Sequence, residues 1–372
     1  MSAAAAKARK AAPSKVARDS ADAAETPASR GFFMPAEWEE HAATWLAWPH
    51  EEEDWPGKIA PIPWVFAEAV RQLAQGERVR IFVGTAALEK SARTLLKRVG
   101  VDLREIDFVR APTDRVWTRD SLPQILRHKD GSRALSSCHF NGWAKYPNHK
   151  RDALLPLSVA GRLGLEIWTP MREGKRVVLE GGAIDVNGRG SLLTTEECLL
   201  SDVQVRNPGM TRDEYEQLFA EQLGARHTIW LGEGIVGDDT HGHVDDLARF
   251  VDARTVLLAV ERDRSDENYA RLQDNLRRLK KAKDQDGRPL HVLELPMPAP
   301  LLLDGQRLPA SYANFYIGNA AVIVPTFNDP NDRVALNLIA KLFPRRRVVG
   351  IHAVDLVWGL GTLHCMTQQE PA

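Results

Sequence analysis

Segments with the apolar pattern of a helix alternate with short apolar runs from Gly31 onward, and this alternation constrains the fold most strongly. Residues that commonly precede helices, such as Thr85, Thr211 and Asp329, stand before several of the helical segments. The helices expected are 64–75, 86–98, 152–163, 212–223, 267–283 and 331–342. The strands expected between them include 79–83, 177–179, 255–260, 321–324 and 348–351. Helices and strands that alternate at this spacing predict an α/β protein.

The domain organisation follows from what the chain lacks. No Pro/Gly-rich linker and no exact internal repeat interrupts residues 31–372, so we predict a single domain there. Residues 1–30 are rich in Ala, Lys, Arg and Ser and predict a disordered tail. A transit peptide is the alternative, but Asp19, Asp22 and Glu25 count against it. The G-x-G sequences at 188–190 and 359–361 lack a third glycine and a following helix, which argues against a dinucleotide site.

Charge and cysteine content narrow the class of partner. The formal net charge is -1 and no long basic stripe follows the first thirty residues, so we expect no nucleic-acid partner. No apolar run is long enough to span a bilayer, so we expect no membrane partner either. The three cysteines are widely spaced and form no C-x-x-C pair, which favours a reducing, cytoplasmic compartment over a disulfide framework. A small-molecule substrate is the remaining expectation.

Cys365 is the candidate nucleophile. It lies in the run from Leu363 to Gln369, and a thiol there is better explained by chemistry than by packing. A cysteine nucleophile needs a proton carrier, groups that hold an electrophile, and a sheltered site. We interpret Cys138 and Cys198 as small buried residues that are dispensable for catalysis.

Residues 238–246 place two histidines and four carboxylates within nine positions. If Val244 points into the core from an extended segment, His243 and Asp245 share the opposite face, because strand side chains alternate. That face would present a proton carrier and an anion. Two alternatives stay open: a turn whose aspartates bond their own backbone, and a metal site built on Asp239, His241 and His243. No H-E-x-x-H or comparable ligand spacing completes such a metal site.

Three other segments carry candidate binding residues. Trp117 stands three residues before Asp120, and an aromatic ring with a carboxylate suits a flat cation; a surface Arg119–Asp120 pair is the alternative. Glu180 follows an expected strand and precedes two glycines, where an ordinary turn with an exposed Glu is the alternative. Asn314 is either a hydrogen-bonding fixture of the core or a ligand contact.

A cysteine, a histidine and separated aspartates suit either a cysteine protease or an enzyme that modifies guanidines. A protease needs one carboxylate to orient its histidine, whereas a planar, positively charged guanidinium needs carboxylates to hold its N–H groups. The number of aspartates favours the guanidine-modifying class.

The motifs in their order resemble the agmatine deiminases and bacterial-type peptidylarginine deiminases of the pentein superfamily. The resemblance runs from Gly31 onward, and its motifs are Gly31–Glu39, Trp45–Pro49, Trp117–Asp120, Leu179–Gly182, Leu193–Leu199, Gly242–Asp245, Ser311–Tyr316 and His364–Gln369. It implies a five-bladed α/β propeller of ββαβ-type repeats around a central site. It also implies hydrolysis of agmatine to N-carbamoylputrescine and ammonia without metal or organic cofactor, and a homodimer that serves polyamine synthesis.

The resemblance also assigns roles by motif. Cys365 would be the nucleophile and His243 the general acid and base, while Asp120 and Asp245 would hold the guanidinium. Further contacts, either to the substrate or to His243, would come from Trp117, Glu180, Asp239 and Asn314.

The chain departs from the family pattern at 140–146, at Asp246 and at 358–363. We expect these departures to reshape the pocket around the far end of the substrate. Free arginine, peptidylarginine or another guanidine therefore stays an alternative substrate, and the extra acidic Asp246 favours the second cation of agmatine. A pentein that binds a guanidine or a partner without turnover is the non-enzymatic alternative.

Overall fold

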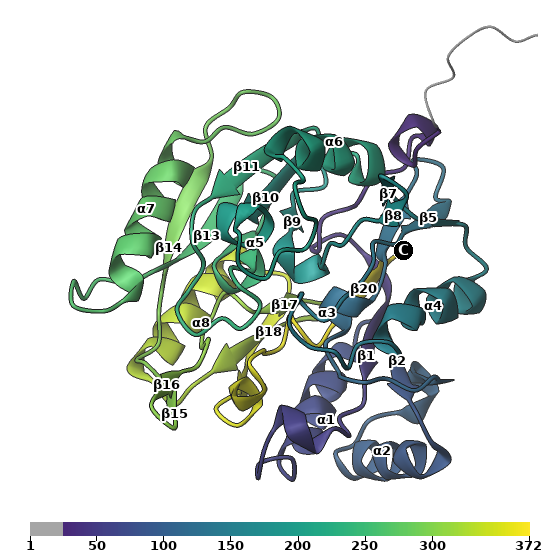
Figure 1. Ribbon diagram of the computed structural model, residues 1–372. Helices are drawn as coiled ribbons and strands as arrows, with labels where there is room; N and C mark the ends of the chain where they lie inside the picture. Colours follow the sequence, from purple (N-terminus) through teal and green to yellow (C-terminus); the bar gives the residue numbers. More distant parts are fainter. Residues whose placement is uncertain (1–24) are drawn as a thin grey trace, which may run out of the picture.

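The computed structural model describes residues 25–372 (Figure 1). Its helices are α1 (Ile62–Leu73), α2 (Ala86–Arg98), α3 (Thr118–Ser121), α4 (Leu155–Leu163), α5 (Glu196–Leu200), α6 (Arg212–Leu223), α7 (Asn268–Lys281) and α8 (Pro330–Leu342). Its strands are β1 (His41–Ala47), β2 (Arg78–Val83), β3 (Ile106–Arg110), β4 (Gln124–Arg127), β5 (Arg133–Ser136), β6 (Ile167–Trp168), β7 (Met171–Arg172), β8 (Lys175–Arg176), β9 (Asp185–Val186), β10 (Ser191–Thr195), β11 (His227–Leu231), β12 (Ala248–Phe250), β13 (Thr255–Val260), β14 (His291–Pro296), β15 (Leu302–Leu303), β16 (Gln306–Arg307), β17 (Tyr316–Ile317), β18 (Ala321–Thr326), β19 (Arg347–His352) and β20 (Gln368–Pro371).

Five sheets repeat one arrangement. In each sheet a short strand pairs antiparallel with a second strand, which then pairs parallel with a third across a helical connection. The sheets are β4-β5-β6, β9-β10-β11, β12-β13-β14, β17-β18-β19 and the four-stranded β20-β1-β2-β3. Helices α2, α4, α6 and α7 lie toward the outside in Figure 1. The predicted mixed α/β domain with ββαβ-type units is thus present, and its closure into a propeller stays a prediction.

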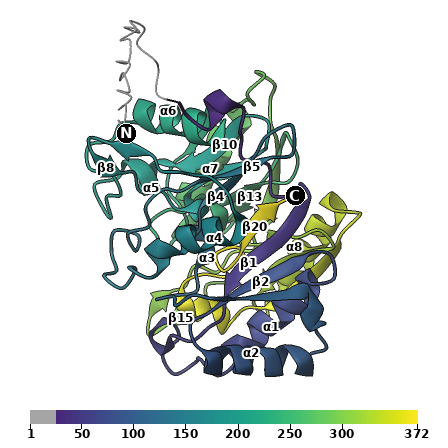
Figure 2. The ribbon, with the colours of Figure 1, turned by 90° about the vertical axis from the view of Figure 1, so that its right-hand side faces the viewer.

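The sheet β20-β1-β2-β3 joins segments from opposite ends of the sequence. Strand β20 pairs antiparallel with β1, with Trp45 opposite Gln368, and β1 pairs parallel with β2. Figures 1 and 2 show the yellow β20 beside the purple β1. This pairing brings the segment just before β20, which contains Cys365, into the body of the fold.

Most of the expected elements are confirmed. Helices α2 and α6 and strand β13 have the predicted bounds, and α1, α7, α8, β2, β18 and β19 differ by no more than a few residues. Thr85 accepts a hydrogen bond from the Leu88 backbone N–H, and Thr211 forms a reciprocal capping box with Glu214. Asp152 instead accepts hydrogen bonds from a separate loop, and α4 begins only at Leu155 after a 3₁₀ turn.

The strand expected at 177–179 is wrong. Strand β8 ends at Arg176, and beyond it Val178 forms only an isolated bridge with His139. The backbone N–H of Val178 donates to the Asn207 side chain at 2.9 Å, and its carbonyl accepts from the same side chain at 2.8 Å. An amide side chain therefore replaces a neighbouring strand at this point.

The N-terminal tail expected at 1–30 falls mostly on residues 1–24, outside the described residues. Residues Ala28–Arg30 form one 3₁₀ turn, and Arg30 lies 2.8 Å from Glu166. No helix of the described chain is long and apolar enough to cross a membrane.

In each of the five sheets, the segment just before the short antiparallel strand carries at least one candidate site residue. These residues are Asp120 before β4, Glu180 before β9, His243 and Asp245 before β12, Asn314 before β17 and Cys365 before β20. Three of the segments are single helical turns, at 118–121, 181–183 and 244–246. Residues far apart in the sequence therefore occupy equivalent places in successive sheets.

Candidate active site

The Cys365 thiol is buried at the inner end of a cavity of about 30 Å³. Trp117 and Asp120 line the same cavity. The sulfur lies 3.7 Å from Asp245 Oδ2. Burial raises the pKa of the Cys365 thiol well above its usual value, and the nearby carboxylates of Asp245, Asp246 and Asp120 raise it further. These surroundings therefore favour the protonated form of the thiol.

Asn314 fixes the segment that carries the thiol. Its Oδ1 accepts hydrogen bonds from the backbone N–H of His364 at 3.0 Å and of Cys365 at 3.3 Å. Its Nδ2 donates to Asp246 Oδ1 at 2.9 Å and lies 3.0 Å from Cys365 Sγ. Asn314 is thus the buried hydrogen-bonding residue that was one of its two interpretations, and it holds the backbone at Cys365 in place.

His243 lies among three carboxylates. Its Nδ1 is 3.8 Å from Asp120 and 4.0 Å from Asp245, and its Nε2 is 3.9 Å from Glu180. Neither ring nitrogen has a hydrogen-bond partner within the described part of the chain, although the ring is buried. Burial alone would lower the pKa of His243, but Asp120, Cys198 and Glu180 outweigh it and raise this pKa well above its usual value. The charged form of the ring is therefore favoured, and its N–H groups have no hydrogen-bond acceptor among the described residues.

The extended conformation expected around Val244 is wrong, because Val244–Asp246 form a 3₁₀ turn. Asp238 Oδ2 accepts hydrogen bonds from the backbone N–H of Gly242 and His243, at 2.7 and 2.8 Å. The expected aspartate turn is therefore real, and it bends the chain just before His243 and Asp245. His243 and Asp245 still face the same site.

Asp120 is the first expected guanidinium ligand. The indole N–H of Trp143 donates to Oδ2 and the backbone N–H of Gly182 donates to Oδ1, both at 2.9 Å. Burial raises the pKa of Asp120 to about 6, with Asp245 and Glu180 among the contributing charges. The alternative of a surface Arg119–Asp120 pair is wrong, because both residues are buried and Arg119 pairs with Glu37 at 3.1 Å.

Asp245, the second expected ligand, is held from behind. His364 Nδ1 lies 2.6 Å from Asp245 Oδ2, and His364 Nε2 lies 2.8 Å from Glu37 Oε2. Burial raises the pKa of Asp245, but the bond and charge of His364 outweigh it and lower this pKa. Arg249 pairs with the same Glu37 at 2.8 Å. Sequence reasoning missed Glu37 and Arg249 as supports, because only their contacts distinguish them from other buried charges.

Glu180 forms an ion pair with His243 and does not line the cavity that contains Cys365. It is fully buried, so the alternative of an exposed Glu in a turn is wrong. Arg206 Nε donates to Glu180 Oε1 at 3.1 Å. Burial raises the pKa of Glu180, but Arg206 and His243 outweigh it and lower this pKa to about 2. Sequence reasoning missed Arg206 because no motif marks it.

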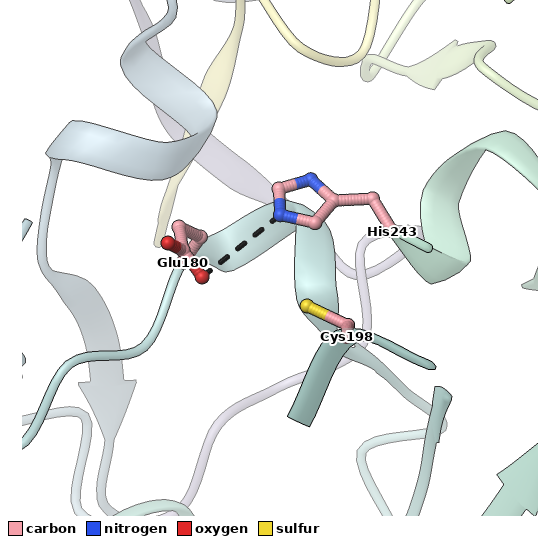
Figure 3. A group of neighbouring side chains, drawn as sticks. All are labelled: Glu180, Cys198 and His243. Atoms are coloured by element: carbon pink, nitrogen blue, oxygen red, sulfur yellow. Dashed lines mark ion pairs between the residues drawn. The ribbon is translucent and has the colours of Figure 1, made fainter. Parts of the chain in front are cut away.

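Cys198 lies against the same histidine. Figure 3 shows its sulfur directed from α5 toward the Glu180–His243 ion pair. Ligand atoms of Glu180, Cys198 and His243 all lie within 4.8 Å of one another. The interpretation of Cys198 as buried is confirmed, and its dispensability stays a prediction. Cys138 is only partly buried.

The metal site considered on Asp239, His241 and His243 is not assembled. His241 Nε2 lies 3.0 Å from Ser201 Oγ, whereas Asp239 pairs with Lys145. Within residues 25–372, the groups with metal-ligand spacing are Glu180–Cys198–His243 and Asp245–Asp246–Cys365. Both groups include residues of the candidate site described above.

The outer end of the cavity is lined by Trp117, Tyr146 and Asp239. A Cβ at Gly361 would lie 2.8 Å from the Trp117 ring, so only glycine permits this approach. A larger cavity of about 950 Å³ adjoins the inner one and shares Arg115, Tyr146 and Asp239 with it. The departures at 140–146 and 358–363 do line the pocket, as expected.

Asp246 lies beside the nucleophile and not at the far end of the pocket. It is buried and bonded by Asn314. Burial raises its pKa well above the usual value, and the neighbouring Asp245 and Asp238 add to the rise. The expectation that Asp246 favours a second substrate cation is therefore wrong, because Asp246 lies beside Cys365 and lines neither of the two cavities.

The sheets and the site together define a class of protein. A buried cysteine, a charged histidine and two carboxylates at the ends of ββαβ-type units are the features expected of guanidine-modifying penteins. The chain belongs to the family of Porphyromonas-type peptidyl-arginine deiminases, which matches residues 33–371.

Curated relatives and solved structures agree with this assignment. The chain is 36% identical over 371 residues to the agmatine deiminase of Stutzerimonas stutzeri, covering 93% of this chain and 97% of the relative. It is 35% identical over 370 residues to that of Ectopseudomonas mendocina, with the same coverage. The structure of agmatine deiminase of Enterococcus faecalis catalysing its reaction superimposes with a TM-score of 0.85 at 31% identity, covering 93% of this chain and 98% of that one.

Proposed function

We propose that this protein is a hydrolase that converts agmatine to N-carbamoylputrescine and ammonia. The observation that carries the proposal is the convergence of Cys365, His243, Asp120 and Asp245 on one buried site. The similarity to agmatine deiminases over 93% of the chain supports agmatine as the substrate. We include in the proposal a homodimer, as the family resemblance implies. We also propose that the protein acts in the cytoplasm, which the free thiols of the described cysteines favour.

Substrate binding activates the nucleophile in this proposal. The positive guanidinium lies between Asp120 and Asp245 and offsets the negative field that keeps the thiol protonated. Cys365 releases its proton to solvent, and the thiolate attacks the guanidinium carbon. A C–S bond forms, the electron pair of one C–N π bond moves to its nitrogen, and a neutral tetrahedral adduct results. The charged His243 donates a proton to the departing nitrogen, and ammonia leaves.

The remaining thiouronium is then hydrolysed. The now neutral His243 accepts a proton from a water molecule that attacks the same carbon. The C–S bond breaks, the ureido product leaves, and the thiol is restored. Glu180 stabilises the charged form of His243 in both steps because Arg206 keeps the Glu180 carboxylate ionised.

The test is ammonia and ureido-product release by the purified protein with agmatine, arginine and an arginine peptide, without added metal. We expect turnover of agmatine and its loss in Cys365→Ala. Turnover of arginine or the peptide in place of agmatine would keep the mechanism and change the substrate. No turnover of any guanidine would favour the pentein that binds without turnover.

A further inference from the structure

The segment 141–146 links the two ends of the cavity. At the inner end, Trp143 donates its indole N–H to Asp120 at 2.9 Å. At the outer end, Tyr146 donates its hydroxyl to Asp239 at 2.6 Å, and Lys145 forms an ion pair with the same carboxylate.

The backbone of this segment is strained, and its hydrogen bonds hold it in place. Trp143 and Ala144 both have positive φ angles, 58° and 54°, although neither is glycine. The Ala144 backbone N–H donates to Asn141 Oδ1 at 2.8 Å. Gln204 Nε2 donates to the backbone carbonyls of Trp143 and Asp239, each at 3.1 Å. These contacts set Lys145 directly beside Asp239.

Asp239 is the carboxylate that a distal substrate cation would meet. The inner cavity that contains Cys365 is lined by two carboxylates, Asp120 and Asp239. Asp120 lies at the guanidinium end, whereas Asp239 also lines the larger outer cavity. The other cation at this end, Arg115, is already paired with Asp54 and bonded to Asn148 at 3.2 Å.

We propose that Lys145 is a resident cation of the distal subsite, which the terminal amine of agmatine displaces from Asp239. This inference rests on the proposed function and names what controls specificity at the same site. The Lys145 side chain is 41% exposed, while that of Asp239 is 18% exposed. An ion pair this exposed is weak and exchanges readily for a cation that arrives with the substrate. Lys145 therefore lowers the affinity for diamine-like guanidines without touching the reacting atoms.

The test compares agmatine with butylguanidine, which has the same guanidinium and carbon chain but no amine. The proteins are the wild type, Lys145→Gln, Asp239→Asn and the double variant, with Lys150→Gln as the control for an exposed lysine. We expect Lys145→Gln to lower the KM for agmatine about two- to fivefold, the scale of an exposed ion pair. The KM for butylguanidine should stay unchanged, as should both constants in Lys150→Gln.

The double variant isolates the exchange. Asp239→Asn should raise the KM for agmatine and not for butylguanidine, and in that background Lys145→Gln should have no further effect. Turnover of butylguanidine shows that each variant is folded. A raised or unchanged agmatine KM in Lys145→Gln, or an equal shift for both substrates, would overturn the inference while the proposed function stands. A wild type that turns over neither substrate would remove the proposed function and this inference together.

A distal carboxylate is the competing chemistry. If 4-guanidinobutyrate were a better substrate than agmatine and Lys145→Gln raised its KM, Lys145 would be an anion ligand and the displacement would be refuted. The observed pairing argues against that result, because the Lys145 ammonium already faces a carboxylate and Arg115 is paired as well.

Discussion

The two ends of the cavity differ in how their charges are held. At the inner end, Asp120, Asp245 and His243 are buried, and hydrogen bonds from Trp143 and His364 orient the two carboxylates. At the outer end, Asp239 and Lys145 are partly exposed and belong to loops. Charges in a buried site interact strongly and cannot be screened, whereas those at an exposed mouth are screened and adjustable. In our proposals the inner end therefore carries out the reaction, and the outer end controls which guanidine binds.

Cys365→Ala should produce the largest effect of any single change. Alanine cannot form the C–S bond, so we expect turnover to fall by at least about 10⁴-fold while the fold persists. Ammonia release and thermal unfolding measure the two properties separately. Cys138→Ala is the matched control, since that thiol lies outside the cavity, and it should retain activity. Comparable losses in both variants would contradict the assignment of the nucleophile.

Asp120→Asn and Asp245→Asn test the carboxylates of the inner end. Each change leaves the buried guanidinium without one of its two anions, which costs about 3–5 kcal/mol. We expect kcat/KM to fall on the order of 10²- to 10⁴-fold for agmatine and equally for butylguanidine. The equal loss for the two substrates distinguishes these variants from Asp239→Asn, which should affect agmatine alone. If the inner variants lost activity toward agmatine alone, the two ends of the cavity would not differ in the way proposed.

Arg206→Met tests whether burial makes the inner charges costly to unpair. The Arg206–Glu180 pair has no exposed side-chain area, so removing the guanidinium should lower the free energy of unfolding by about 3–5 kcal/mol. Arg93→Met is the matched control, because Arg93 pairs with Glu89 on the surface of α2 at 43% exposure. That variant should lose less than about 1 kcal/mol. Urea unfolding of both proteins measures the difference, and equal losses would contradict it.

The sequence predicts the long outer helices of the fold better than its short inner strands. Long helices with caps, such as α2 and α6, carry enough periodicity to fix their bounds. Strands β9 and β17 have two residues each, which is too short for any pattern to mark them. The repeat of five sheets was invisible for the same reason, since the units share strand pairing and not residue identity.

The residues of the candidate site also differ in how well the sequence predicts them. Motifs located Cys365, His243, Asp120 and Asp245, because their chemistry limits which residues can serve. The residues that orient them, such as Arg206, Glu37 and Trp143, act through contacts between distant segments. A single sequence carries no signal for such contacts. Asp246 shows the converse, since its charge could be judged only once its burial was known.

Trp143→Phe should shift the pH dependence without destroying the site. Asp120 must be ionised to hold a guanidinium, and its pKa of about 6 predicts that kcat/KM falls as the pH drops through that value. The Trp143 N–H lowers this pKa, so its loss should move the acid limb to higher pH. Trp168→Phe is the control, because that indole N–H has no partner within residues 25–372. Coincident profiles for Trp143→Phe and the wild type would show that another group sets the limb.

Tyr146→Phe should have a small effect on the KM for agmatine, with a sign opposite to that of Lys145→Gln. The phenylalanine keeps the ring against Arg115 and removes only the hydroxyl that donates to Asp239. A neutral donor orients the carboxylate without competing for the amine charge, so its loss should raise the KM for agmatine about two- to tenfold. The kcat should stay unchanged, and Tyr269→Phe on α7 should change neither constant. A fall in kcat with a constant KM would mean that the mouth is coupled to the chemistry, and the two ends would then act as a single unit.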